Sequence, residues 1–508
     1  MKPFIKFEDR FTDLPLFFQV FAIACSFMFT LAVYGFLIES FREARVFLYC
    51  SLTGFLFFAL INLATSNRNL RESGLTQLIS LLLLFVVLPL FLALPYWIIL
   101  PSISFLDAYL DMVGAFTTTG FPVFEDDLLT RTIHLWRALI AWFGGGLIWI
   151  VAFVILLPAS RGGFDVFSSR NSNSNLKRKL TLNERSMTLT KVSRKLIPIY
   201  IGLSFILWCV LTSFGTDGYI SLIRAFSIMS TSGISAPEKF ESDGAGFFGE
   251  FAMAIFLLLA LSHSIIYSLN KKAGLKKLIS DKEIRLGLFT VSCITIVLSL
   301  KDMNLILAEF NLNSSFLSGL KLVWGNFFTS LSFITTNGYF SSYWVGQSSS
   351  VEMPHITIVL IGLCLFGGGL ATTAGGIKLL RISILFSAFS NETGKLLHPS
   401  SMAGTDFNLK RLEISVFMAW VFFMLFIFSL AFVTIILAMF GISFEDAIVL
   451  AVACLTTTGP IIEAIGINSS LISELSYFSK LTLAGSMVLG RLEILVALSV
   501  ITIALRRI

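Results

Sequence analysis

Charged side chains are scarce in this chain of 508 residues, because Asp, Glu, Lys and Arg together make up only 13% of it. A soluble globular protein usually carries about 25% charged residues, so an ordinary water-facing surface is excluded. Hydrophobic residues make up 56%, and several apolar runs reach the roughly 20 residues that a helix needs to cross a bilayer. The short alternating segments of a transmembrane barrel are absent. The composition therefore predicts an all-α integral membrane protein.

Cysteine and histidine are also sparse, with six and four residues, and their spacing excludes several chemistries. No Cys pair has a CxxC-like spacing, and no Cys, Asp or Glu completes a ligand or triad pattern around a His, which argues against a disulfide framework or a zinc site. The chain has no P-loop lysine motif and no GxGxxG after a strand, so no nucleotide cofactor is expected in it. A membrane-embedded enzyme would need acids and histidines converging on one face, whereas the intramembrane charges here are few and dispersed.

Four copies of one polar motif stand out against this apolar background. Each copy consists of Ser or Thr, then Thr, then a variable residue, then Gly. One such tetrapeptide is a common turn, but four copies at near-equal spacing, each between apolar segments, indicate a pore whose wall one chain builds four times. The copies are Thr117-Thr118-Thr119-Gly120, Ser230-Thr231-Ser232-Gly233, Thr335-Thr336-Asn337-Gly338 and Thr456-Thr457-Thr458-Gly459.

The chemistry of the motif suits a filter for a monovalent cation. Irregular backbone at membrane depth is tolerated where it lines a water-filled cavity, and in a selectivity filter its carbonyl oxygens replace the hydration shell of the ion. Glycine permits a positive φ, threonine adds neutral oxygens, and none of the carboxylates that divalent ions prefer is present in a motif. The residue before glycine varies, so the backbone rather than that side chain is predicted to bind the ion. The predicted ion-binding residues are Thr118, Thr119, Gly120, Thr231, Ser232, Gly233, Thr336, Asn337, Gly338, Thr457, Thr458 and Gly459.

Hydropathy predicts ten spanning helices and four re-entrant pore segments. Two N-terminal helices at 14–38 and 46–63 precede four groups of helix, re-entrant segment and helix. Each short helix before a motif would direct its negative C-terminal end toward the pore, which favours a cation. The groups are 75–100, 105–121 and 135–157; 196–214, 219–234 and 247–269; 286–300, 320–339 and 356–389; and 414–440, 444–461 and 481–505. The chain accordingly divides into an N-terminal extension (1–70), repeat one (71–160), a basic loop with repeat two (161–280), repeat three (281–395) and repeat four (396–508).

Two details refine this arrangement. Phe, Asp and Ala precede the glycine at the same offsets in repeats one and four, as Asp107 and Asp446 illustrate.

Basic residues gather on the side opposite to the motifs, with nine Lys and Arg against two acids in 160–195, and six against two in 271–285. By the positive-inside rule that side is cytoplasmic, and an even number of spans places both termini there. Such a surface suits anionic lipid, and nothing in the sequence indicates binding to nucleic acid.

A glycine-rich stretch interrupts the second helix of repeat three. Each glycine costs a helix roughly 1 kcal/mol relative to alanine, so an unwound loop is predicted, with close packing through small residues as the alternative. The shorter run Gly144–Gly146 leaves both interpretations open. The predicted gate residues in the interrupted helix are Gly367, Gly368, Gly369, Thr372, Thr373, Gly375 and Gly376.

Arg491 lies in the middle of an apolar span, where a charge is costly and usually faces the protein interior. We interpret it as a gate residue that holds the glycine-rich loop through backbone carbonyls. The alternative is a structural pair with Glu493 or another acid. His263, in the second helix of repeat two, either tunes gating with pH or packs at a helix interface.

Together these features resemble the Trk/Ktr/HKT superfamily of potassium transporters, closest to its bacterial TrkH/TrkG branch, over nearly the whole chain. The four motifs, the two extra N-terminal helices, the glycine runs and the stretch Gly490-Arg491-Leu492-Glu493 carry the resemblance. It implies four M1-P-M2 units around one pore, an intramembrane loop that blocks that pore, and K⁺ as the transported ion, since glycine stands at all four filter positions. The stretch around His263 departs from the glycine pair usual in the family.

The resemblance also implies partners and a location. We expect a homodimer in the bacterial inner membrane, gated by a cytoplasmic nucleotide-binding regulatory subunit of the TrkA type, so any nucleotide acts through that partner. Transport of sodium or ammonium, and symport coupled to protons or sodium instead of channel-like flow, remain the alternatives that the sequence leaves open.

Overall fold

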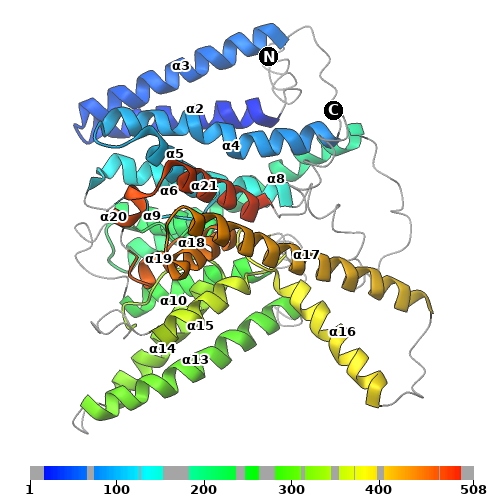
Figure 1. The fold of residues 1–508 in the computed structure, drawn as a ribbon. Helices are drawn as coiled ribbons and strands as arrows, with labels where there is room; N and C mark the ends of the chain where they lie inside the picture. Colours follow the sequence, from blue (N-terminus) through cyan, green and yellow to red (C-terminus); the bar gives the residue numbers. More distant parts are fainter. Residues whose placement is uncertain are drawn as a thin grey trace.

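The structure is a computed structural model, which describes residues 16–65, 74–124, 128–152, 182–235, 246–262, 281–309, 315–344, 354–370, 372–397, 406–467 and 469–492. Within these ranges every regular element is a helix. The long helices lie side by side, with the N-terminal helices at one edge of the bundle and the helices of repeat three at the opposite edge (Figure 1).

The N-terminal extension is a helical hairpin of α2 (Leu16–Leu37) and α3 (Phe41–Thr65). Its tight turn places Glu39 at a φ of 63°. α2 packs against α4 (Gly74–Ile99) and α6 (Arg131–Val151), whereas α3 leaves much of its apolar surface uncovered. Both helices lie where the hydropathy predicts them.

Each of the four predicted groups contains a short helix that ends at a motif. In repeat one α5 (Phe105–Phe116) lies between α4 and α6. The others are α8 (Leu182–Ser213), α9 (Gly218–Ser230), α10 (Gly246–Leu257) and η4 (Leu258–Leu261) in repeat two; α13 (Lys282–Glu309), α14 (Ser315–Ile334), α15 (Pro354–Leu365) and α16 (Leu379–Leu397) in repeat three; and α17 (Asp406–Met439), α18 (Phe444–Thr456), α19 (Ile461–Ala464), α20 (Ser469–Glu474) and α21 (Tyr477–Leu492) in repeat four.

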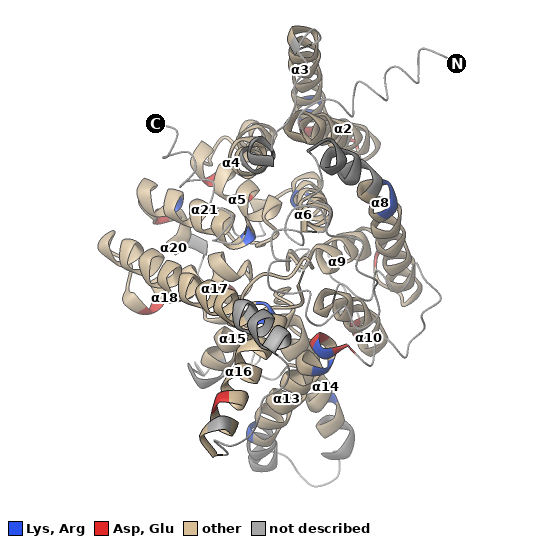
Figure 2. Cartoon of the chain, turned by 90° about the vertical axis from the view of Figure 1, so that its right-hand side faces the viewer, with Lys and Arg blue, Asp and Glu red and all other residues tan. Residues whose placement is uncertain are grey.

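The repeats close into a ring. The helix after each motif packs against the short helix of the next repeat: α6 against α9, α10 against α14, and α15 against α18. The last contact, between α21 and α5, joins the fourth repeat to the first. Figure 2 shows the repeats following one another around a centre, and it shows how few Lys, Arg, Asp and Glu residues the helices carry. The four motifs therefore meet in the middle of the ring.

Seven of the described helices are long and apolar enough to cross a membrane. They include the first helix of every repeat, both N-terminal helices and α6. The helices after the other three motifs are shorter within the described residues. α10 and η4 together reach Leu261, α21 reaches Leu492, and α15 stops at the glycine-rich stretch. The predicted segment 356–389 is thus two helices, α15 and α16. The total of ten spans stays a prediction.

Candidate functional site

The short helices α5 and α18 begin with the same cap. The hydroxyl of Ser104 accepts a hydrogen bond from the backbone N–H of Asp107 at 3.2 Å and donates one to its carboxylate at 2.6 Å. Ser443 and Asp446 repeat this arrangement, with distances of 3.1 and 2.6 Å. Each serine hydroxyl satisfies a backbone donor that the helix leaves unpaired, and the carboxylate three residues later orients that hydroxyl. The aspartate offset shared by repeats one and four therefore serves to start these helices.

The backbone adopts one unusual conformation at the same place in all four motifs. The threonine two residues before glycine has a positive φ each time: 56° at Thr118, 54° at Thr231, 57° at Thr336 and 55° at Thr457. Left-handed backbone is uncommon for a residue that is not glycine, and for a β-branched residue it marks strain of order 1–3 kcal/mol. Elsewhere in the described residues only Glu39 shares it among non-glycine residues. The surrounding ring therefore imposes this backbone four times.

The motif glycines allow neighbouring motifs to touch. Gly120, Gly233 and Gly338 have positive φ values of 62°, 68° and 81°, as the sequence predicts, but Gly459 does not. At all four positions a Cβ would collide with the adjacent motif, so glycine is needed for close approach as well as for φ. A Cβ would meet the carbonyl oxygen of Ser232 from Gly120, that of Asn337 from Gly233, the ring of Pro460 from Gly338 and the carbonyl oxygen of Gly120 from Gly459.

The variable position plays two different roles. In the first motif the hydroxyls of Thr117 and Thr119 lie 2.9 Å apart, and the corresponding pairs in the second and fourth motifs lie at 3.1 and 3.2 Å. In the third motif the side-chain oxygen of Asn337 instead accepts a hydrogen bond from the backbone N–H of Gly233 at 3.2 Å. The backbone N–H of Gly459 likewise donates to the Thr119 carbonyl at 2.6 Å. The side chain at this position therefore either pairs within its own motif or bonds to the neighbouring motif.

The glycine-rich stretch between α15 and α16 is not helical and lies against the third and fourth motifs. The backbone N–H of Gly375 donates to the hydroxyl of Thr336 at 2.9 Å, and a Cβ on Gly375 would collide with the carbonyl oxygen of Thr456. The guanidinium of Arg491, on α21, donates to the carbonyl oxygen of Thr373 at 2.6 Å. We call residues 366–370 and 372–378 the intramembrane loop. It is unwound, as the sequence predicts, so the alternative of a helix packed through its glycines does not hold here.

Gly369 and Leu370 of the intramembrane loop contact repeat two and the start of repeat three. The backbone N–H of Gly369 donates to the Ala260 carbonyl at 3.1 Å, and that of Leu370 donates to the carboxylate of Glu283 at 3.0 Å. Glu283 lies in the first turn of α13 and is only 3% exposed. The sequence patterns did not identify this residue; its signal was that it is one of two acids within a basic segment.

The run Gly144–Gly146 lies within the continuous helix α6 and allows close packing. A Cβ on Gly144 would collide with the carbonyl oxygen of Phe116, at the end of α5. A Cβ on Gly490, in α21, would likewise collide with the carbonyl oxygen of Leu455, in α18. These glycines bring the helix that follows a motif against the C-terminal end of a short helix, so the packing alternative holds for the run Gly144–Gly146.

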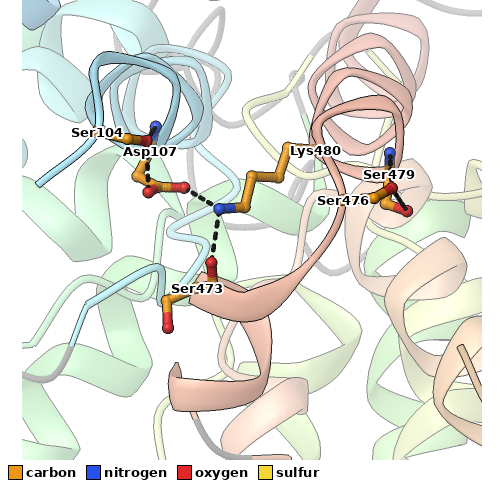
Figure 3. A network of polar contacts seen from close by, with 6 residues as sticks. All are labelled: Ser104, Asp107, Ser473, Ser476, Ser479 and Lys480. Atoms are coloured by element: carbon orange, nitrogen blue, oxygen red, sulfur yellow. Dashed lines mark hydrogen bonds and ion pairs between the residues drawn. The ribbon is translucent and has the colours of Figure 1, made fainter.

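Two buried ion pairs were also missed. Arg137 on α6 lies 3.0 Å from the carboxylate of Asp111 on α5, with exposed side-chain fractions of 6% and 1%. Lys480 on α21 reaches the carboxylate of Asp107 at 2.5 Å and donates to the Ser473 carbonyl at 2.7 Å (Figure 3). Buried charges are tolerated when they are paired. The two pairs tie α6 and α21 to α5, and the partners are too far apart in sequence for a local pattern to show them.

All predicted filter and gate residues lie within the described ranges, and the structure brings them into one contiguous region. His263 and Glu493 lie outside those ranges, so the pH-tuning and Glu493-pairing alternatives stay predictions.

Comparison with known proteins shows relatives along most of the chain. The TrkH family model, described as a cation transport protein, matches residues 59–506. The Trk system potassium uptake protein TrkG of Escherichia coli (strain K12) is 27% identical over 403 residues, which cover 77% of this chain and 77% of that protein. The TrkH protein of the same strain is 26% identical over 412 residues, or 79% and 80% of the two chains.

The fold also matches a solved structure. The crystal structure of the potassium transporter TrkH from Vibrio parahaemolyticus superposes with a TM-score of 0.77 at 20% sequence identity, covering 96% of this chain and 97% of that one. This likeness shows that the two chains share their fold.

Proposed function

Since the chain belongs to the TrkH family of cation transport proteins, we propose that it carries K⁺ across a bacterial inner membrane through a single pore lined by the four motifs. Family membership makes it a multi-pass transport protein and not an enzyme. The observation that carries the proposal is the left-handed threonine, which recurs at one position in every motif beside a glycine that touches the next motif.

Selection of K⁺ is supported by the ring of glycines and by the relatives. The proteins of Escherichia coli that align with this chain are named potassium uptake proteins. Each motif offers neutral backbone and hydroxyl oxygens, which suit a monovalent ion that must bind and leave again. The proposed K⁺ ligands are the Thr-x-Gly residues of the four motifs.

We place the gate at the intramembrane loop. It bonds to Thr336 of the third motif, and Arg491 holds its Thr373 carbonyl. Loss of the Arg491 hydrogen bond would free this segment to move. The role of Arg491 is that of a positioning residue, since its described contact is to the loop.

The remaining parts of the proposal concern orientation and partners. The basic segments 160–195 and 271–285 support a cytoplasmic location for the side opposite to the motifs, and with ten spans for both termini. On the family resemblance we propose a homodimer that is regulated by a cytoplasmic nucleotide-binding subunit of the TrkA type, with K⁺ as the cargo and no cofactor in this chain.

Flux measurements in proteoliposomes test the proposal. Uptake is followed under K⁺, Rb⁺ or Na⁺ gradients, each with and without a proton gradient. We expect K⁺ uptake that exceeds Na⁺ uptake. Uptake that follows the K⁺ gradient alone favours a channel, and dependence on the proton or sodium gradient favours a symporter. Equal uptake of K⁺ and Na⁺ would overturn K⁺ selection.

A further inference from the structure

We propose that Glu283 is a second positioning residue for the intramembrane loop, which it holds at Leu370. This inference rests on the proposed role of that loop as the gate. The motif and glycine patterns do not single out Glu283, and the structure places its carboxylate directly on the loop backbone.

The two holding contacts have opposite polarity. Glu283 accepts a hydrogen bond from the backbone N–H of Leu370 at 3.0 Å, and Arg491 donates one to the backbone carbonyl of Thr373 at 2.6 Å. Both side chains are buried, at 3% and 5% exposed. Hydrogen bonds to ionised groups are shorter and stronger than neutral ones. A carboxylate from α13 in repeat three and a guanidinium from α21 in repeat four therefore bond to the loop backbone three residues apart, at Leu370 and Thr373.

Further contacts connect the loop to the ends of two helices. Asp281 caps α13 by accepting a hydrogen bond from the backbone N–H of Glu283 at 3.3 Å. The same carboxylate accepts one from the hydroxyl of Ser262, just after η4, at 2.6 Å. The loop itself is bonded to η4, because Gly369 donates to the Ala260 carbonyl at 3.1 Å.

The end of repeat two and the start of repeat three thus form one bonded unit with the loop. Along the chain these two ends are joined by residues 263–280, which include Lys271, Lys272, Lys276 and Lys277. A displacement of the first turn of α13 would withdraw the Glu283 carboxylate from Leu370. The position of that turn therefore sets how firmly the loop is held.

Three substitutions of Glu283 distinguish the contribution of its acceptor oxygen from that of its charge. Glu283→Gln keeps an acceptor oxygen at the same reach but without the charge, so its flux should lie between that of the parent protein and those of the other two variants. Glu283→Ala removes the acceptor, and Glu283→Asp withdraws it by one methylene while keeping the charge. Both should raise K⁺ flux of the full-length protein alone in proteoliposomes by about tenfold, in keeping with the loss of one charge-assisted hydrogen bond. Glu474→Ala, at an exposed glutamate in α20, is the matched control and should not change flux.

A double substitution tests whether both residues hold the same element. If Glu283 and Arg491 hold the same loop as one coupled unit, Glu283→Ala combined with Arg491→Ala should raise flux by less than the product of the two single effects, because the effects of coupled residues are not additive. A flux equal to the product of the two single effects would overturn the shared role. If Glu283→Ala does not fold, the comparison of Glu283→Asp with Glu283→Gln decides the question.

The outcomes distinguish this inference from the function on which it rests. Raised flux in Arg491→Ala with parental flux in both Glu283→Ala and Glu283→Asp would overturn the role of Glu283 and leave the gate in place. Parental flux in Arg491→Ala as well would overturn the gate. Raised flux in Glu283→Gln equal to that in Glu283→Asp would also contradict the inference, because the acceptor oxygen would then be irrelevant.

Discussion

The side-chain oxygen of Asn337 accepts a hydrogen bond from the backbone N–H of Gly233, so a residue of the third motif holds the backbone of the second. The other three motifs have a hydroxyl here, which pairs within its own motif. One quarter of the ring is therefore bonded to its neighbour in a way that the others are not.

Replacing this amide should weaken ion discrimination. Asn337→Thr introduces the residue found in the first and fourth motifs and removes the bond to Gly233. We expect the K⁺/Na⁺ flux ratio to fall roughly threefold to tenfold, the effect of one neutral hydrogen bond on the filter backbone. Thr458→Ser keeps the hydroxyl that pairs with Thr456 and is the matched control. An unchanged ratio in Asn337→Thr would show that the bond is irrelevant to selection.

A side chain at Gly120, the glycine of the first motif, should also lower the K⁺/Na⁺ flux ratio, but through a steric collision. A Cβ on Gly120 would collide with the carbonyl oxygen of Ser232, so Gly120→Ser must displace a predicted K⁺ ligand. We expect the K⁺/Na⁺ ratio to drop by about tenfold, which corresponds to about 1.4 kcal/mol in relative binding. Gly485→Ala, where a Cβ meets open space on α21, should leave the ratio unchanged. Equal ratios for Gly120→Ser and the parent protein would refute the prediction.

Removal of Arg491 should loosen the gate. Arg491→Ala leaves the Thr373 carbonyl without its charged donor, and such a bond contributes about 1.5–3 kcal/mol. We expect Rb⁺ flux into proteoliposomes to rise at least tenfold when no regulatory partner is present. Arg491→Lys retains a cationic donor and should give an intermediate flux. Parental flux in Arg491→Ala would remove the residue from the gating model.

The buried pair of Arg137 and Asp111 should matter for stability far more than an exposed pair. Arg137→Ala removes the guanidinium that lies 3.0 Å from the buried Asp111 carboxylate, and breaking a buried ion pair by removing one partner costs about 3–5 kcal/mol. Arg131 and Asp217 form a comparable pair at 3.9 Å with exposed fractions of 43% and 55%, so Arg131→Ala should cost less than about 1 kcal/mol. Thermal unfolding in detergent measures both. Similar losses for the two variants would contradict the buried role of Arg137.

The positions of the short helices could be predicted closely from local patterns. The segments that hydropathy predicts at 105–121 and 444–461 begin at the same residues as α5 and α18, where the structure shows a Ser-x-x-Asp cap. The break after α15 was also predictable, since consecutive glycines disfavour a helix. Local composition controls both features, so the sequence alone reveals them.

Contacts between repeats were not predictable in the same way. The glycines of α6 fitted either a break or close packing, and only the position of the Phe116 carbonyl decides between them. Glu283 and Asn337 act on backbone N–H groups 87 and 104 residues away along the chain. Their roles depend on which motif lies beside which, and that depends on closure of the ring and not on any one segment.

The Gly459 motif shows that four motifs supplied by one chain can differ from one another. Its glycine departs from the positive φ of the other three, and Pro460 fills the space beside two of them. A channel assembled from four identical subunits would repeat any such change on every side. In the proposed pore a single codon alters one side and leaves three intact. Mutation could then adjust the proposed ion selection one side at a time, whereas a symmetric assembly would change on all four sides at once.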